Sequence, residues 1–162
     1  MTLTFQLNTP RDALAKAGRE LGALQAAVVS QDMSRIGDCL YNFSVSAYHV
    51  KDWLVEDPSG ACPKGDVEAF VKATPSLIVC RDLCNASKHR RIRKYVPDAS
   101  SVTTSAPTSF TLASAPSPAV GGRRNAPFRV KVITADGRRL EVLALGADAI
   151  AAWERFFEQH GF

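Results

Sequence analysis

Two segments of this 162-residue chain combine histidine, aspartate and lysine within runs whose other residues are largely apolar. The first is residues 48–53 (YHVKDW), and the second is residues 81–89 (RDLCNASKH). An imidazole can gain or lose a proton near neutral pH, and a neighbouring carboxylate can take part in the same acid–base chemistry. If both segments are helical and face each other, their side chains could share one polar site.

Apolar spacing predicts a helix for each segment. One helix begins between Asp32 and Asp38 and extends to about Glu56, and its buried stripe consists of Ile36, Leu40, Phe43, Ala47, Val50 and Leu54. A helix that is apolar nearly all round is buried on several sides. A polar strip on this central helix consists of Asn42, Ser46, His49 and Trp53, with Asp52 displaced around the surface.

The second segment lies on a helix predicted from Pro75 to about Arg91. Its core-facing residues are Leu77, Cys80, Leu83 and Cys84, and its separate polar line consists of Asp82, Asn85 and His89. A groove between the two helices would hold two imidazoles, two carboxylates, an amide and the Lys88 ammonium. Ligand-binding roles are therefore predicted for His49, Asp52, Trp53, Asp82 and Asn85.

Three interpretations of this cluster stay open. A buried histidine can be a structural group whose hydrogen bonds are satisfied within the core. It can also serve binding or acid–base chemistry. Metal binding by His49, Asp52, Asp82 and His89 is the third interpretation, and it ranks last because metal sites between helices usually include glutamate. We therefore expect no metal and no cofactor, and leave open whether the protein is an enzyme.

The spacing His49-x-x-Asp52-Trp53, followed by Arg81-Asp82-x-x-Asn85-x-x-Lys88-His89, resembles a group of uncharacterised bacterial and phage-associated proteins. The match covers the two central helices. The group has no known function that could be transferred to this chain.

The second segment is also distantly similar to the HEPN superfamily of small helical nucleotide-binding proteins and RNases, whose nucleases carry an R-x(4–6)-H motif. Arg81 and His89 are separated by seven residues, which on a regular helix turns the two side chains about 80° apart. The resemblance implies an RNA-cleaving or phosphoester-acting enzyme, with His89 as the acid–base group and Arg81 or Lys88 stabilising charge.

The remaining elements complete an α+β domain that is mostly a bundle of about four helices. Thr9-Pro10-Arg11-Asp12 predicts a capped helix start, and that helix should extend to Val29. Asp66 should cap a short helix ending at Ala73. Residues 10–96 thus form the helical part, and residues 97–127 form a Ser/Pro-rich loop with a weak third strand at 109–113. Residues 128–145 form a β-hairpin with an Asp-Gly turn. Residues 146–160 form a C-terminal helix that begins near Asp148.

Composition fits a single globular domain, with 46% hydrophobic and 22% charged residues. Residues 1–9 lack the pattern of a secretory signal, so we expect a cytoplasmic protein with no membrane segment. The four cysteines form no CxxC pair and are predicted to pack as small apolar residues, with a zinc site of Cys62, Cys80, Cys84 and a histidine as a minor alternative. A net charge of +4 is compatible with a small anionic ligand, a nucleotide or RNA. The C-terminal helix should pack within the chain, and the uncovered sheet edges favour a homo-oligomer.

Overall fold

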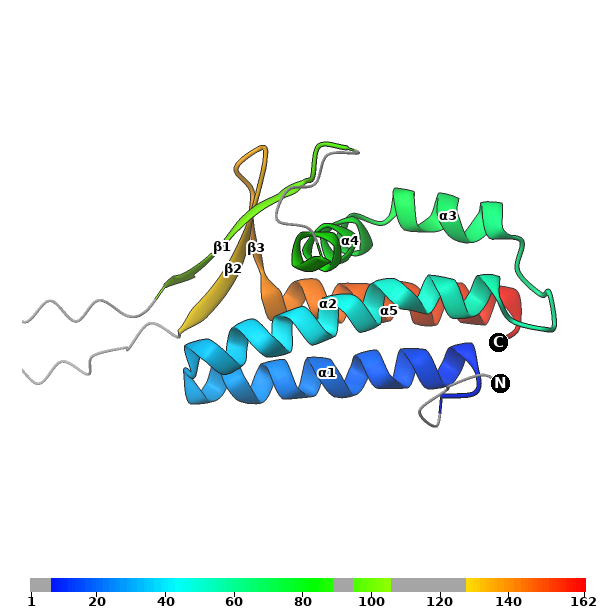
Figure 1. Cartoon of the computed structure of the whole chain (residues 1–162), viewed down its shortest axis with the longest axis horizontal. Helices are drawn as coiled ribbons and strands as arrows, with labels where there is room; N and C mark the ends of the chain where they lie inside the picture. Colours follow the sequence, from blue (N-terminus) through cyan, green and yellow to red (C-terminus); the bar gives the residue numbers. More distant parts are fainter. Residues whose placement is uncertain (1–6, 89–94, 106–127) are drawn as a thin grey trace, which may run out of the picture.

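The computed structural model describes residues 7–88, 95–105 and 128–162, and it has the predicted α+β, mostly helical architecture (Figure 1). The elements are, in order, α1 (Pro10–Ser30), α2 (Met33–Val55), α3 (Lys64–Ala73), α4 (Pro75–Lys88), β1 (Ala99–Ser105), β2 (Arg129–Thr134), β3 (Arg139–Glu141) and α5 (Val142–His160). The predicted turn of helix at 89–91 and the weak strand at 109–113 lie outside the described residues.

The start of α1 is capped as its sequence predicts. Thr9 accepts a hydrogen bond from the Asp12 backbone amide, and the Asp12 carboxylate accepts one from the Thr9 amide. This reciprocal pair satisfies amides that the helix itself cannot pair. At the other end, Gln31 adopts a left-handed conformation and Asp32 caps α2, so that α1 and α2 form a tight helical pair.

The helices bury two neighbouring apolar clusters. In the first, the carboxyl-terminal half of α2 packs with α1, α3, α4 and the aromatic end of α5. In the second, the amino-terminal half of α2 packs with the end of α1 and the inner face of the sheet. The predicted stripe of α2 is buried throughout. Trp153 of α5 is fully buried, and its indole N–H donates to the Ala47 carbonyl at 2.8 Å, so α5 packs within the chain.

The sheet is antiparallel in the order β1-β2-β3. Val130, Val132 and Thr134 of β2 are buried against the helices, while the intervening residues face outward. Three strands were expected at most, but the third one lies at Ala99–Ser105, a stretch predicted to be loop. This strand was not predicted because its many serine and threonine residues are also typical of polar linkers, although threonine is common in strands.

Two predicted boundaries are wrong. The second hairpin strand stops at Glu141, and α5 starts at Val142 rather than near Asp148. Val142, Leu145 and Ala149 are buried at helical spacing, so the apolar run serves a helix. Gly146 lies inside this helix, where a Cβ would clash with a methyl carbon of Leu21.

The start of α3 also differs from the prediction. Asp66 does not cap this helix, because α3 begins at Lys64 and Pro63 occupies the cap position. Asp66 instead lies in the first turn, where a carboxylate favours the positive end of the helix dipole.

Candidate functional site

The packing of α4 against α2 brings the two sequence segments together, as their apolar spacing predicts. The Nε2 atom of His49 lies 3.7 Å from the Sγ atom of Cys84. The imidazole is half-buried, whereas the thiol is fully buried. His49 therefore contacts α4 directly, and Cys84 is a neighbour that the sequence pattern identifies only as a core residue.

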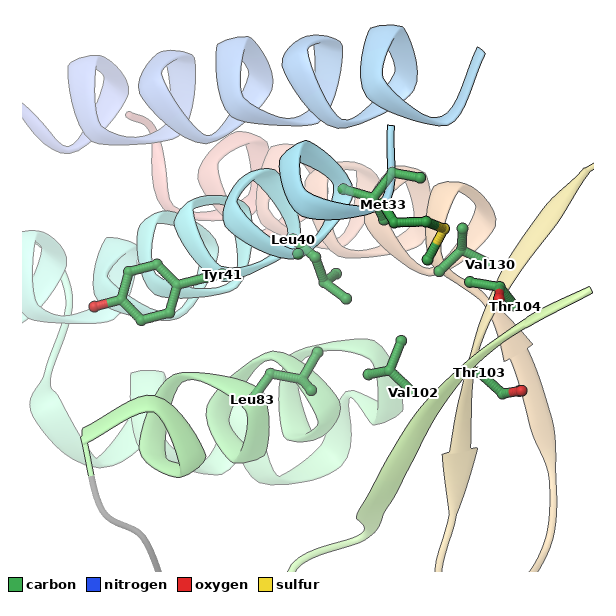
Figure 2. Close-up of a pocket in the computed structure, with 10 residues that line it drawn as sticks. Met33, Leu40, Tyr41, Leu83, Val102, Thr103, Thr104 and Val130 are labelled. Carbon is green, nitrogen blue, oxygen red and sulfur yellow. The ribbon is translucent and has the colours of Figure 1, made fainter. Parts of the chain in front are cut away.

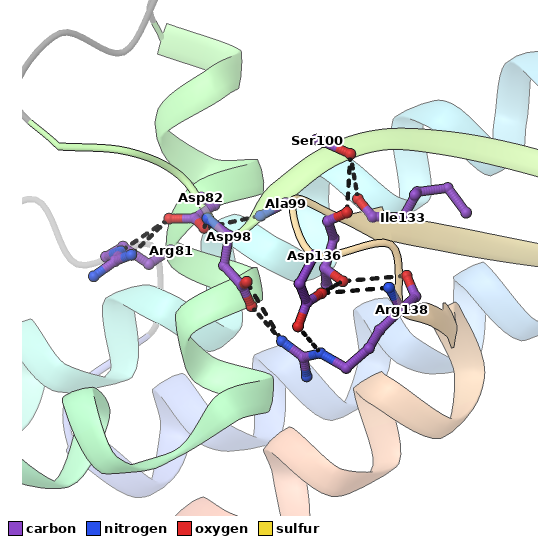
Figure 3. A network of polar contacts seen from close by, with 9 residues as sticks. Arg81, Asp82, Asp98, Ala99, Ser100, Ile133, Asp136 and Arg138 are labelled. Atoms are coloured by element: carbon purple, nitrogen blue, oxygen red, sulfur yellow. Dashed lines mark hydrogen bonds and ion pairs between the residues drawn. The ribbon is translucent and has the colours of Figure 1, made fainter.

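Asp82 points into a different environment from the one predicted. Its carboxylate is 1% exposed, forms an ion pair with Arg81 at 2.8 Å, and accepts hydrogen bonds from the backbone amides of Asp98 and Ala99 at 2.6 and 3.1 Å (Figure 3). These amides belong to the chain entering β1. A buried carboxylate needs such donors, so Asp82 ties α4 to the sheet and does not join a groove with His49 and Asp52.

Arg81 and Asn85 of α4 both contact Tyr95, which lies in the segment leading to β1. The Arg81 guanidinium lies 4.3 Å from the centre of the Tyr95 ring, and the Asn85 amide donates to the Tyr95 hydroxyl at 2.8 Å. Burial lowers the pKa of Arg81, but its hydrogen bond and charge interaction with Asp82 raise it overall. Arg81 is thus a permanent cation held between a carboxylate and an aromatic face.

A similar cation lies on α2. The Lys51 ammonium is 4.9 Å from the centre of the Tyr48 ring and 2.5 Å from a carboxylate oxygen of Asp52. Burial raises the pKa of Tyr48, and the positive charges of Lys51 and Arg81 partly offset this rise. For Lys51, burial lowers the pKa, and Asp52 more than offsets this, so that the ammonium stays protonated.

These contacts define a surface that we call the α2–α4 face: Tyr48, His49, Lys51, Arg81 and Tyr95. The Tyr48 ring centre lies 6.1 Å from that of the half-buried His49, and each cation lies over a tyrosine ring, Lys51 over Tyr48 and Arg81 over Tyr95. Cation and aromatic groups in such proximity suit ligands that combine phosphate with a flat base. Sequence reasoning included Tyr48 and Lys51 in the first polar segment but named neither as a binding residue, and it gave no role to Tyr95. A signal was present, because Tyr48 and Lys51 flank His49 and Tyr95 directly follows a basic run.

The other predicted residues are placed separately. The Asp52 side chain is about half exposed, at 51%, beside Lys51. Trp53 is partly buried and packs against the first apolar cluster, while Ser46 accepts a hydrogen bond from Lys16 at 3.0 Å. The backbone of Lys88 ends α4, and His89 lies outside the described residues.

The cysteine prediction is confirmed by burial. All four thiols are buried and none forms a disulfide. Burial raises the pKa of Cys80 to about 12, which leaves this thiol protonated and unreactive at neutral pH. Within the described ranges, no three histidine, cysteine or acidic side chains are arranged to hold a metal ion.

An apolar cavity, lined by none of the five residues of the α2–α4 face, lies between the amino-terminal part of α2, α4 and strands β1 and β2 (Figure 2). Its volume is about 530 Å³, and its lining includes Met33, Leu40, Tyr41, Leu83 and Val102. Met33 and Val102 are 50% and 47% exposed, so the cavity opens to the surface. Its described lining is mostly apolar, with the hydroxyls of Tyr41, Thr103 and Thr104, and includes no histidine, cysteine or charged side chain.

The chain matches no protein-family model, and comparisons with curated proteins and with solved structures find no match. No helix in the described part of the chain is long and apolar enough to cross a membrane.

Proposed function

We propose that this protein binds a nucleotide-like, phosphate-bearing ligand at the α2–α4 face. One observation carries the proposal: Lys51 of α2 and Arg81 of α4, two helices that pack against each other, each lie over the ring of a tyrosine. The rings restrict where each cation can lie, so less freedom is lost when a phosphate binds. The ligand class is the one predicted from the sequence, but the binding site is centred on Tyr48 and Tyr95 rather than on Asp82.

Two carboxylates, Asp52 and Asp82, should limit how strongly the α2–α4 face binds an anionic ligand. Asp52 and Asp82 neutralise part of the positive charge on Lys51 and Arg81. Asp82 is buried within its own hydrogen bonds, whereas Asp52 is exposed and can release Lys51. A phosphate therefore competes with Asp52 for the same ammonium group. This competition gives a directional test, because removing the Asp52 charge should strengthen binding.

The test is fluorescence anisotropy or calorimetry with ATP and with a short single-stranded RNA. Lys51→Gln should weaken binding by about tenfold, the usual value of one charge-assisted hydrogen bond. Asp52→Asn should strengthen binding. Lys72→Gln, which removes an exposed lysine of α3, is the matched control and should leave affinity unchanged. Equal affinities in all four proteins, or no binding by the unaltered chain, would refute the proposal.

RNA cleavage is the alternative function. It assigns acid–base chemistry to His89 and charge stabilisation to Arg81 or Lys88, following the similarity to HEPN nucleases. Arg81 is supported as a cation of the α2–α4 face by its position over Tyr95. The same RNA reveals this activity as shortened product, and a folded His89→Ala variant should then bind the RNA without cutting it. Intact RNA after incubation with the unaltered protein would exclude cleavage of that substrate.

We also propose, from the sequence, that the protein forms a homo-oligomer in the cytoplasm. Size-exclusion chromatography with light scattering tests the first part, and a mass equal to one chain would contradict it.

A further inference from the structure

The outer face of the sheet carries a second group of cations and hydroxyls. Strand register aligns Ser101 with Ile133 and Arg139 in one row, and Thr103 with Lys131 and Glu141 in the next. Lys131 and Arg139 are therefore diagonal neighbours on adjacent strands, which places their backbones about 7–8 Å apart. Both side chains are long enough to reach one group between them.

Glu141 does not neutralise Lys131, although it is directly opposite in the register. It forms an ion pair with Arg129 instead. In the part of the chain that the structure describes, no ion pair involves Lys131 or Arg139. These two cations are thus available, while the adjacent carboxylate is occupied.

The turn beside them is held by its own polar network (Figure 3). Asp136 accepts hydrogen bonds from Thr134 and Arg138, and the Arg138 guanidinium also forms an ion pair with Asp98 at 3.2 Å. These contacts fix the chain between β2 and β3 and neutralise Arg138. Arg139, the next residue, is exposed and is the first residue of β3. A fixed backbone lowers the entropic cost of placing its guanidinium on a ligand.

We propose that this outer sheet face, consisting of Ser101, Thr103, Lys131, Ile133 and Arg139, binds the phosphoryl group of a small phosphate monoester. These residues line a hollow of about 600 Å³. Lys131 and Arg139 supply the positive charge, and Arg139 can donate two parallel hydrogen bonds to phosphate oxygens. The hydroxyls of Ser101 and Thr103 supply further donors, and Ile133 gives an apolar floor. This site is independent of the α2–α4 face.

The experiment is a titration of the isotope-labelled full chain with inorganic phosphate and, separately, with phosphoserine, followed by amide chemical shifts. Saturable shifts are expected in β1, β2 and β3. Lys131→Gln and Arg139→Gln should each weaken binding by about tenfold, and Lys131→Arg should retain it. Arg155→Gln removes an exposed arginine of α5 and is the matched control, expected to change nothing.

Comparison of the two ligands identifies the source of the phosphoryl group. Tighter binding of phosphoserine supports an esterified phosphate, whereas equal or weaker binding would overturn the monoester assignment, because the ester group would then add nothing to recognition of the phosphoryl group. Absence of saturable shifts with either ligand would overturn the site. The site would also be overturned if Lys131→Gln, shown to be folded by its spectrum, binds as well as the unaltered chain.

Discussion

Replacement of Asp82 by alanine should cost a large part of this protein's stability. The buried carboxylate accepts two hydrogen bonds from Arg81, at 2.8 and 3.0 Å, and one each from the amides of Asp98 and Ala99. Asp82→Ala leaves both amides without this acceptor, at about 1 kcal/mol each because they are only partly buried. Loss of the Arg81 pair adds about 1–2 kcal/mol, since a quarter of that side chain is exposed and can be rehydrated.

The sum is about 3–4 kcal/mol, compared with a total stability of about 5–15 kcal/mol for ordinary domains. Urea unfolding followed by circular dichroism measures it. Asp82→Asn keeps one acceptor oxygen and should lose about half as much. Asp38→Ala, at an exposed site on α2, should change stability by less than about 0.5 kcal/mol. If Asp82→Ala lowers the free energy of unfolding no more than Asp38→Ala does, Asp82 does not stabilise the fold by linking α4 to β1.

Three further predictions concern packing, reactivity and ionisation. Gly146→Val should destabilise the protein by about 1–3 kcal/mol through overpacking against Leu21, whereas Gly18→Ala, in open space on α1, should stabilise it by about 0.5–1 kcal/mol; thermal melts that rank them the other way would contradict this. Cys80, whose pKa burial raises to about 12, should resist maleimide at pH 8 until urea unfolds the chain, and native labelling at the rate of a free thiol would count against it. Hydrogen bonds from Thr134 and Arg138 lower the pKa of Asp136 to about 2. The contribution of the ionised Asp136 to folding stability should therefore be complete above about pH 4 and decline as the pH falls toward 2. A carboxyl titration of Asp136 by carbon NMR with a midpoint near 4 would contradict this.

The long helices could be predicted because one-sided burial leaves a clear period in the sequence. In α2, the residues from Ile36 to Leu54 at helical spacing are buried, and the Thr9 cap marks the start of α1. The sheet was harder to predict, because β1 consists mainly of serine and threonine, which also occur in linkers. The start of α5 was missed for another reason: Val142 and Leu143 suit a strand as well as a helix, and only their packing decides between the two.

The site could be predicted only to the level of two facing helices. Helical periodicity brought His49 and α4 together, but it placed Asp82 on the same groove. Asp82 instead accepts hydrogen bonds from the backbone amides of residues 98 and 99. Because almost every residue has a backbone amide, no pattern of side chains in the sequence could predict these partners. Tyr95, in the segment before β1, likewise contacts Arg81 of α4, and this contact depends on tertiary structure rather than on helical spacing.

The most direct test of the central claim is amide chemical-shift mapping with ATP and, in parallel, a short single-stranded RNA, using the unaltered chain and Lys51→Gln. The account predicts shifts concentrated at residues 48–52, 81–85 and 95, strongly reduced by Lys51→Gln. No shifts with either ligand, or shifts that leave these residues unaffected and persist in the variant, would contradict the assignment of ligand binding to the α2–α4 face.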